Sequence, residues 1–172
     1  MQRQSSGRGF TLVELLVAVV VLAVIISIAL PAMQSLIARQ RLKSVVETLL
    51  SDLRAARTEA LVVGMSGAVT VTMNYASAGQ TWSYTIASSG TAATVQRSQD
   101  DYAGGITAAV TGWGATSSLA SFTLTPVRRL DSAGVGSVTF AYGSLSATVE
   151  RNLLGSVFVC SANSELGYSQ CS

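Results

Sequence analysis

Hydrophobic and polar positions divide the first part of the chain into two helical segments of different character. From Leu15 to Leu30, sixteen consecutive residues carry no charge, and Ser27 is the only polar side chain among them. Such a run leaves no helix face for water, which is typical of a membrane span or of a buried core helix. Counted from Phe10 to Leu30, the segment has 21 residues. As a helix it spans roughly 31 Å, enough to cross a bilayer.

Residues 32 to 63 predict an amphipathic helix. Apolar side chains recur every three or four positions and charged side chains occupy the other faces, so one stripe should pack on a protein core. The stripe lacks a sustained heptad, which makes a coiled coil the weaker alternative. Pro31 predicts a bend between the two segments, and Gly64 is suited to end the helix. The stripe consists of Leu42, Val45, Val46, Leu49, Leu53, Ala56, Ala60 and Val63.

Beyond residue 64 the chain alternates between short strand-like runs and clusters of Gly, Ser and Asn. Tyr142-Gly143-Ser144 lies between two such runs and predicts a tight hairpin. A helix followed by successive short strands predicts an α+β fold, in which the helix packs on an antiparallel sheet. The predicted strands cover residues 68–75, 81–87, 94–97, 106–110, 121–125, 137–142, 145–150 and 155–160.

Composition excludes several classes of function. The 172 residues are 49% hydrophobic and 12% charged, and the formal charge of +2 is accounted for by Arg3 and Arg8. The rest of the chain is neutral, so nothing draws it towards nucleic acid. There is no histidine, which removes Ser-His and Cys-His nucleophiles. Asp100-Asp101 is a weak candidate calcium ligand, and a solvated loop is the better interpretation. We expect no enzymatic activity and no cofactor or metal.

Cys160 and Cys171 are the only cysteines. If the preceding helix exports the C-terminal side of the chain, both lie in an oxidising compartment, and a disulfide between them is expected. It would stabilise the fold by roughly 2–3 kcal/mol on a chain-entropy basis. Metal binding without histidine and a catalytic thiol without a base are the weaker alternatives.

Glu14 is the anomaly of the N-terminal segment, because a carboxylate in an apolar helix is costly in lipid and marks a functional position by default. The stretch from Arg8 to Leu16, RGFTLVELL, resembles the class III signal of type IV pilins and type II secretion pseudopilins. A signal anchor with a stray acid near the interface is the alternative interpretation.

The resemblance implies a processing and assembly role for the N-terminus. A prepilin peptidase would cut between Gly9 and Phe10 and methylate the new Phe10 amine. Glu14 would pair with the terminal amine of a neighbouring pilin or pseudopilin subunit, since a buried acid is tolerable when a cation satisfies it. Pro31 falls where many pilins bend this helix. The chain would be a single-pass protein of the bacterial inner membrane, with its globular domain in the periplasm and then in the filament.

The resemblance also implies a domain organisation, that of the pilin fold. Residues 1–9 would be a leader peptide and residues 10–31 a transmembrane or filament-core helix. Residues 32–63 would be the amphipathic helix of the globular domain, and residues 64–172 its β-rich part.

Three further stretches resemble the FimT/GspH branch of pseudopilins. They are Ala56-Arg57-Thr58-Glu59-Ala60, Phe122 to Pro126, and a last strand leading into Cys160. This branch implies a minor pilin in the initiation or tip complex of a type IV pilus. The first alternative is a minor pseudopilin of a type II secretion system. Arg57 and Glu59 have an alternative interpretation as solvated helix charges.

DNA binding, known in some members of this branch, is the second alternative. The arginine pattern that supplies their cations is replaced here by Gly155-Ser156-Val157-Phe158. Arg128, Arg129 and Arg151 would form at most a small patch with weak, salt-sensitive phosphate binding. We therefore do not expect nucleic acid as a partner.

Overall fold

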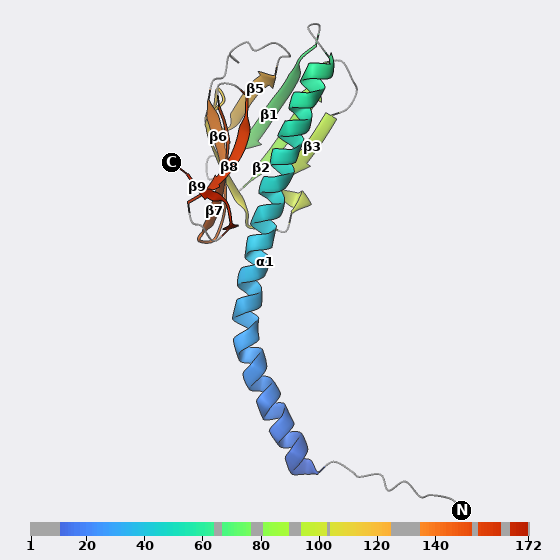
Figure 1. Ribbon diagram of the computed structural model, residues 1–172, viewed down its shortest axis with the longest axis vertical. Coiled ribbons are helices and arrows are strands. Elements are labelled where there is room, and N and C mark those ends of the chain that lie inside the picture. Colours follow the sequence, from blue (N-terminus) through green and yellow to red (C-terminus); the bar gives the residue numbers. More distant parts are fainter. Residues whose placement is uncertain are drawn as a thin grey trace, which may run out of the picture. The chain divides into compact units, whose positions relative to one another are not determined.

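The long helix α1 runs from Leu12 to Val63, over 52 residues, in a computed structural model of the chain (Figure 1). The structure describes residues 11–63, 67–76, 81–89, 94–102, 104–124, 135–152, 155–162 and 166–171. Two compact units are present, one ending at Ile37 and the other beginning at Ala38. The described part of the first is mainly the apolar part of α1, and the second contains the rest of α1 and the described strands.

Four strands form an antiparallel sheet in the order β3-β2-β1-β5. Side chains alternate between buried and half-buried along β1 and β2, as expected of strands with one face on a core. In the central pairs Val71 lies opposite Ile86, and on the other side Phe122 lies opposite Val71. The strands are β1 (Val69–Tyr75), β2 (Trp82–Ser88), β3 (Thr94–Ser98) and β5 (Leu119–Leu124).

The second sheet has the order β4-β6-β7-β8-β9, and only its β8–β9 pair is parallel. The predicted hairpin is confirmed: β6 and β7 are joined by Gly143-Ser144, with Tyr142 opposite Leu145. Gly143 has a φ of 61°, which glycine adopts without steric penalty. The strands are β4 (Thr107–Gly112), β6 (Gly136–Tyr142), β7 (Leu145–Arg151), β8 (Val157–Ser161) and β9 (Ser169–Gln170).

The apolar stripe predicted on the second helical segment forms the centre of the core. Its members from Leu42 to Ala60 are no more than 4% exposed. They pack in one cluster with residues of both sheets, including Tyr84 and Phe140. The later part of α1 thus lies alongside both sheets (Figure 1), which confirms the predicted α+β layout of a helix on antiparallel sheet.

A sharp turn carries the chain from the second sheet back to the first. Gly112, Trp113 and Gly114 all have positive φ, at 74°, 53° and 64°, a conformation that is uncommon for tryptophan. Trp113 is 2% exposed, and its ring centroid lies 4.8 Å from that of Phe122. Burial of this large ring between strands holds the turn in its left-handed conformation.

Candidate functional site

The N-terminal end of α1 is a capped helix start. The Glu14 backbone N–H donates to Thr11 Oγ1 at 3.3 Å, and the Leu15 N–H donates to the Thr11 carbonyl at 3.2 Å. Thr11 is therefore the N-cap, and it satisfies donors that a helix start leaves without intrahelical partners. Glu14 stands in the first turn, where a negative charge interacts favourably with the helix dipole. The favourable interaction with the helix dipole thus also gives Glu14 a structural role at this position.

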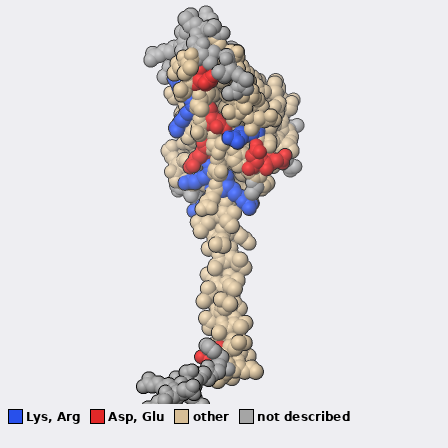
Figure 2. All heavy atoms as spheres, turned by 90° about the vertical axis from the view of Figure 1, so that its right-hand side faces the viewer, with Lys and Arg blue, Asp and Glu red and all other residues tan. Residues whose placement is uncertain are grey.

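The helix surface that follows is apolar on all sides. The large hydrophobic side chains of the first unit are between 41% exposed, at Ile37, and 81% exposed, at Leu12. Figure 2 shows this stretch of α1 as an uncharged surface beyond Glu14. Exposed apolar patches larger than a few hundred Å² are rare on proteins that stay in water. This surface therefore requires lipid or other apolar helices around it.

The two hydroxyls of the segment are compatible with a lipid environment. Ser27 Oγ donates to the Val24 carbonyl at 2.7 Å, and Ser35 Oγ donates to the Ala32 carbonyl at 2.8 Å. Both donors are thus satisfied within the helix, which an apolar solvent demands. Among the described residues, α1 is the one helix long and apolar enough to cross a membrane.

The remaining N-terminal predictions are not tested by this structure. Gly9 and Phe10 lie outside the described residues. The backbone of Pro31 lies within α1, and the bend predicted there stays a prediction.

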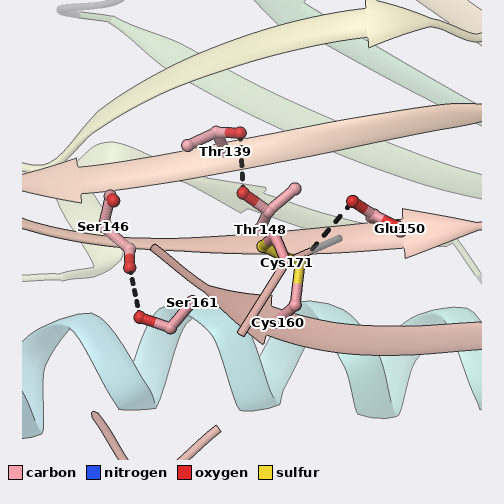
Figure 3. The surroundings of a disulfide bond; sticks show 7 residues. All are labelled: Thr139, Ser146, Thr148, Glu150, Cys160, Ser161 and Cys171. Atoms are coloured by element: carbon pink, nitrogen blue, oxygen red, sulfur yellow. Dashed lines mark hydrogen bonds between the residues drawn. A yellow bond between two sulfur atoms is a disulfide. The ribbon is translucent and has the colours of Figure 1, made fainter. Parts of the chain in front are cut away.

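The predicted disulfide is present. Cys160, at the end of β8, is bonded to Cys171, and their Cα atoms are 4.9 Å apart (Figure 3). Glu150 Oε1 lies 3.6 Å from Cys160 Sγ. Glu150 and the two cysteines are close enough together to hold a metal ion, but the sulfurs are bonded to each other. While this disulfide is intact, they offer no thiolate to a metal.

The basic patch predicted from Arg128, Arg129 and Arg151 is wrong at Arg151, because this side chain is buried. Arg151 is 3% exposed, and its guanidinium carbon lies 4.6 Å from the centroid of the Phe122 ring. This is a cation–π contact inside the core, so Arg151 is not available to a nucleic-acid phosphate at the surface. The burial pattern of β7, with every second residue buried, places its side chain inward. Arg128 and Arg129 lie outside the described residues.

Arg57, which the sequence offered as a family residue or a solvated charge, ties the helix to a sheet. Its Nη1 donates to the Gly155 carbonyl at 2.6 Å, in the segment between β7 and β8. Asp101 also has a local role, because its carboxylate accepts from the Ser98 backbone N–H at 2.7 Å. A capping interaction of this kind accounts for the acid without a bound ion.

Two hydroxyl–carboxylate pairs connect α1 to later parts of the chain, and they were not predicted from the sequence. Tyr84 Oη donates to Asp52 Oδ2 at 2.8 Å, and Arg97 Nε lies 3.6 Å from the same oxygen. Burial, followed by the bond to Asp52, raises the pKa of Tyr84 far above its ordinary value of 10.0. The neighbouring Asp52 charge also raises the pKa of Arg97. Spacing along one chain carries no signal for contacts between elements this distant.

The second pair lies near the end of the described chain. Tyr168 Oη donates to Glu47 Oε1 at 3.1 Å. Burial, followed by this hydrogen bond, raises the pKa of Tyr168 to about 12. Lys43 Nζ lies 5.5 Å from the centroid of the same ring. The disulfide holds the residues that follow β8 to that strand, and the Tyr168 side chain also holds them to α1.

Comparison with known proteins identifies the N-terminal segment. Residues 5–30 match the family described as the prokaryotic N-terminal methylation motif. This range contains Gly9, Phe10, Thr11 and Glu14 as well as most of the exposed apolar helix. No curated protein and no solved structure matched the chain. The motif is the signature of type IV pilin-like proteins and points to a structural protein that is processed and anchored at the inner membrane.

Proposed function

We propose that the chain is a minor pilin of the FimT/GspH type, incorporated into a type IV pilus and acting in its initiation or tip complex. The observation that carries the proposal is the match of residues 5–30 to the methylation motif, on a helix whose apolar surface is exposed on all sides. The FimT/GspH assignment rests on the resemblance of residues 56–60 and 122–126. Prepilin peptidase would cut between Gly9 and Phe10 and methylate Phe10.

In this proposal Glu14 fixes the register of the subunit in the filament core. An ionised carboxylate among apolar helices is costly by several kcal/mol unless a cation satisfies it. The methylated Phe10 amine of a neighbouring subunit is such a cation. Subunits placed in the wrong register leave both charges without a partner, and correct addition is thereby favoured.

A minor pseudopilin of a type II secretion system is the alternative that the same motif supports. The test is a deletion strain in which sheared surface pili and type II secretion are followed in the same cultures. We expect lost or reduced pili with intact secretion. Lost secretion with normal pili would replace the proposal by the pseudopilin, and normal levels of both would contradict each of them.

The role of Glu14 can be separated from its part in the helix start. Thr11 caps the first turn, so Thr11→Ala weakens the cap by about 1 kcal/mol and keeps the charge. Glu14→Gln keeps the size of the side chain and removes its charge. We expect Glu14→Gln to be processed and inserted yet missing from sheared filaments, whereas Thr11→Ala is recovered in them. Equal recovery of both variants would contradict the assembly role.

A further inference from the structure

We propose that the globular unit binds anionic phospholipid headgroups through a basic collar on its first two helical turns, formed by Arg39, Arg41 and Lys43. The proposal rests on the proposed function in one respect, since it needs the apolar segment to be in a membrane. It goes further by assigning a lipid-binding surface, for phosphate-bearing headgroups, to the globular unit itself.

The distribution of charge along α1 carries the first step. Between Glu14 and Glu47 the chain has no acidic residue, and its only charged side chains are Arg39, Arg41 and Lys43. The first of them follows Leu30 by nine residues, or roughly 13 Å of helix. A bilayer has about 5–8 Å of polar headgroup region on each side of its hydrocarbon core. When the apolar run fills the core, the first of these cations therefore lies about 5–8 Å outside the headgroup region, which is within one Debye length at physiological salt.

Two tyrosines from distant parts of the chain carry the second step. Arg41 Nη1 donates to Tyr142 Oη at 3.3 Å, at the end of β6. Lys43 lies against the ring of Tyr168. Both tyrosines are half-buried, with an apolar ring packed on the core and a polar hydroxyl group. Tyrosines in this amphipathic setting are enriched at membrane–water interfaces, as are neighbouring cations near helix ends.

The collar is arranged as a ring and not as a stripe. Successive residues of a helix are 100° apart, so Arg39 and Lys43 lie on one side and Arg41 nearly opposite. Leu42, which is buried, lies between Arg41 and Lys43 in the sequence. Figure 2 shows basic side chains at the lower end of the globular unit, with further basic and acidic ones higher on the same face. Each juxtamembrane cation of this kind raises the affinity for an anionic membrane surface about fivefold.

The test uses the full chain in phosphatidylcholine bilayers that contain trace spin-labelled phosphatidylglycerol or phosphatidylcholine. Electron paramagnetic resonance gives the fraction of each label held at the protein. We expect a preference of about fivefold or more for phosphatidylglycerol at low salt, which falls at high salt because the attraction is screened. Arg39→Gln/Arg41→Gln/Lys43→Gln should bring the ratio close to one. A preference retained by this variant would overturn the proposal.

Arg54→Gln is the matched control. Arg54 is an exposed cation of the same helix, eleven residues beyond Lys43, or roughly 16 Å further from the membrane. That is about two Debye lengths at physiological salt, so its loss should leave the preference unchanged. An equal fall with Arg54→Gln would mean that total charge, and not the collar, attracts the lipid, and the proposal would be wrong.

Two further measurements distinguish misfolding of the variant, failure of membrane insertion and absence of a lipid preference from one another. If the triple variant misfolds, Arg39→Lys/Arg41→Lys keeps the charge and should keep the preference, and its loss would contradict an electrostatic collar. Resistance of the wild-type protein to carbonate extraction reports membrane insertion by itself. A protein that is extracted by carbonate contradicts the proposed function, whereas an inserted protein without lipid preference contradicts only the collar.

Discussion

Tyr84 and Tyr168 each donate a hydroxyl to an acidic side chain of α1, but their surroundings differ. Tyr84 is 1% exposed, and its bond to Asp52 is shared with Arg97. Tyr168 is half-buried beside Glu47. Burial and the bond to Asp52 raise the pKa of Tyr84 further than burial and the bond to Glu47 raise the pKa of Tyr168. Tyr168 is therefore the residue whose titration can be observed.

The first prediction concerns the alkaline pH dependence of stability. The pKa of Tyr168 is about 12 in the folded protein, against an ordinary value of 10.0. Because the folded value is the higher one, the stabilisation is fully present below pH 10 and is lost as the pH rises to about 12. For this partly exposed pair we expect a loss of about 1 kcal/mol. Urea unfolding of wild type and Tyr168→Phe from pH 9 to 12 measures it.

The Phe variant should be less stable than wild type at pH 9, and the difference should shrink towards pH 12. A difference that stays constant with pH would show that the hydroxyl stabilises by packing and not through its bond to Glu47.

Arg151 gives the second prediction. Its guanidinium is buried over Phe122, so Arg151→Gln should lower the free energy of unfolding by about 2–3 kcal/mol through loss of the contact and of packing. The same substitution should leave the affinity for duplex DNA at the level of a neutral control protein at physiological salt. Calorimetry and a filter-binding titration measure the two effects. Sub-micromolar DNA binding that weakens in Arg151→Gln would reopen the DNA-receptor alternative.

At the scale of elements, the close approach of β6 to the Trp113 turn gives the third prediction. A Cβ added at Gly136 would collide with the ring atoms of Trp113, and a buried indole in a constrained turn has little room to move. Gly136→Ala should therefore destabilise the protein by about 3 kcal/mol or more. Gly104→Ala is the control, because a Cβ there meets nothing within 4 Å. Similar melting temperatures for the two variants would contradict this account.

Most of the elements could be predicted from the sequence, because their signals are local. The apolar run, the stripe from Leu42 to Ala60 and the alternation along β1 and β7 each depend on a period of 3.6 or 2 residues. Partition of the strands into two sheets was not predicted, nor was the two-residue strand β9. These depend on which strands pair edge to edge within each sheet, which a periodic pattern does not encode.

The candidate site likewise has some features with a local sequence signal and others that depend on contacts between distant parts of the chain. The T-x-x-E pattern of Thr11 and Glu14 is a readable capping signal, and RGFTLVELL carried the resemblance that the motif match supports. The burial of Arg151 was readable only from its register in β7. The contacts of Asp52 and Glu47 join elements that are far apart in sequence, so only the folded structure gives them.

At the scale of the whole molecule, the disulfide gives a prediction about compartment. Three cations follow the apolar segment closely and two precede it, so the charge count does not by itself set the orientation. If the globular unit is periplasmic, Cys160 and Cys171 should be oxidised in cells, and alkylation with a heavy thiol reagent before reduction should not shift the protein on a gel. A Cys160→Ser/Cys171→Ser variant should be less stable by about 2–3 kcal/mol. Free thiols in the wild-type protein would contradict the orientation.

The interleaved strand order has a consequence for the time course of folding. Sheet β3-β2-β1-β5 is complete once Leu124 is available, whereas β4, which precedes β5, has no partner until β6 follows. If the chain crosses a membrane in order from its N-terminal side, the sheet β3-β2-β1-β5 can form first. Strand β4 then remains unpaired until β6, residues 136–142, has also crossed. The half-finished intermediate exposes a bare strand edge, and Cys171 arrives after all the strands. The covalent bond can therefore form only after every strand has been delivered.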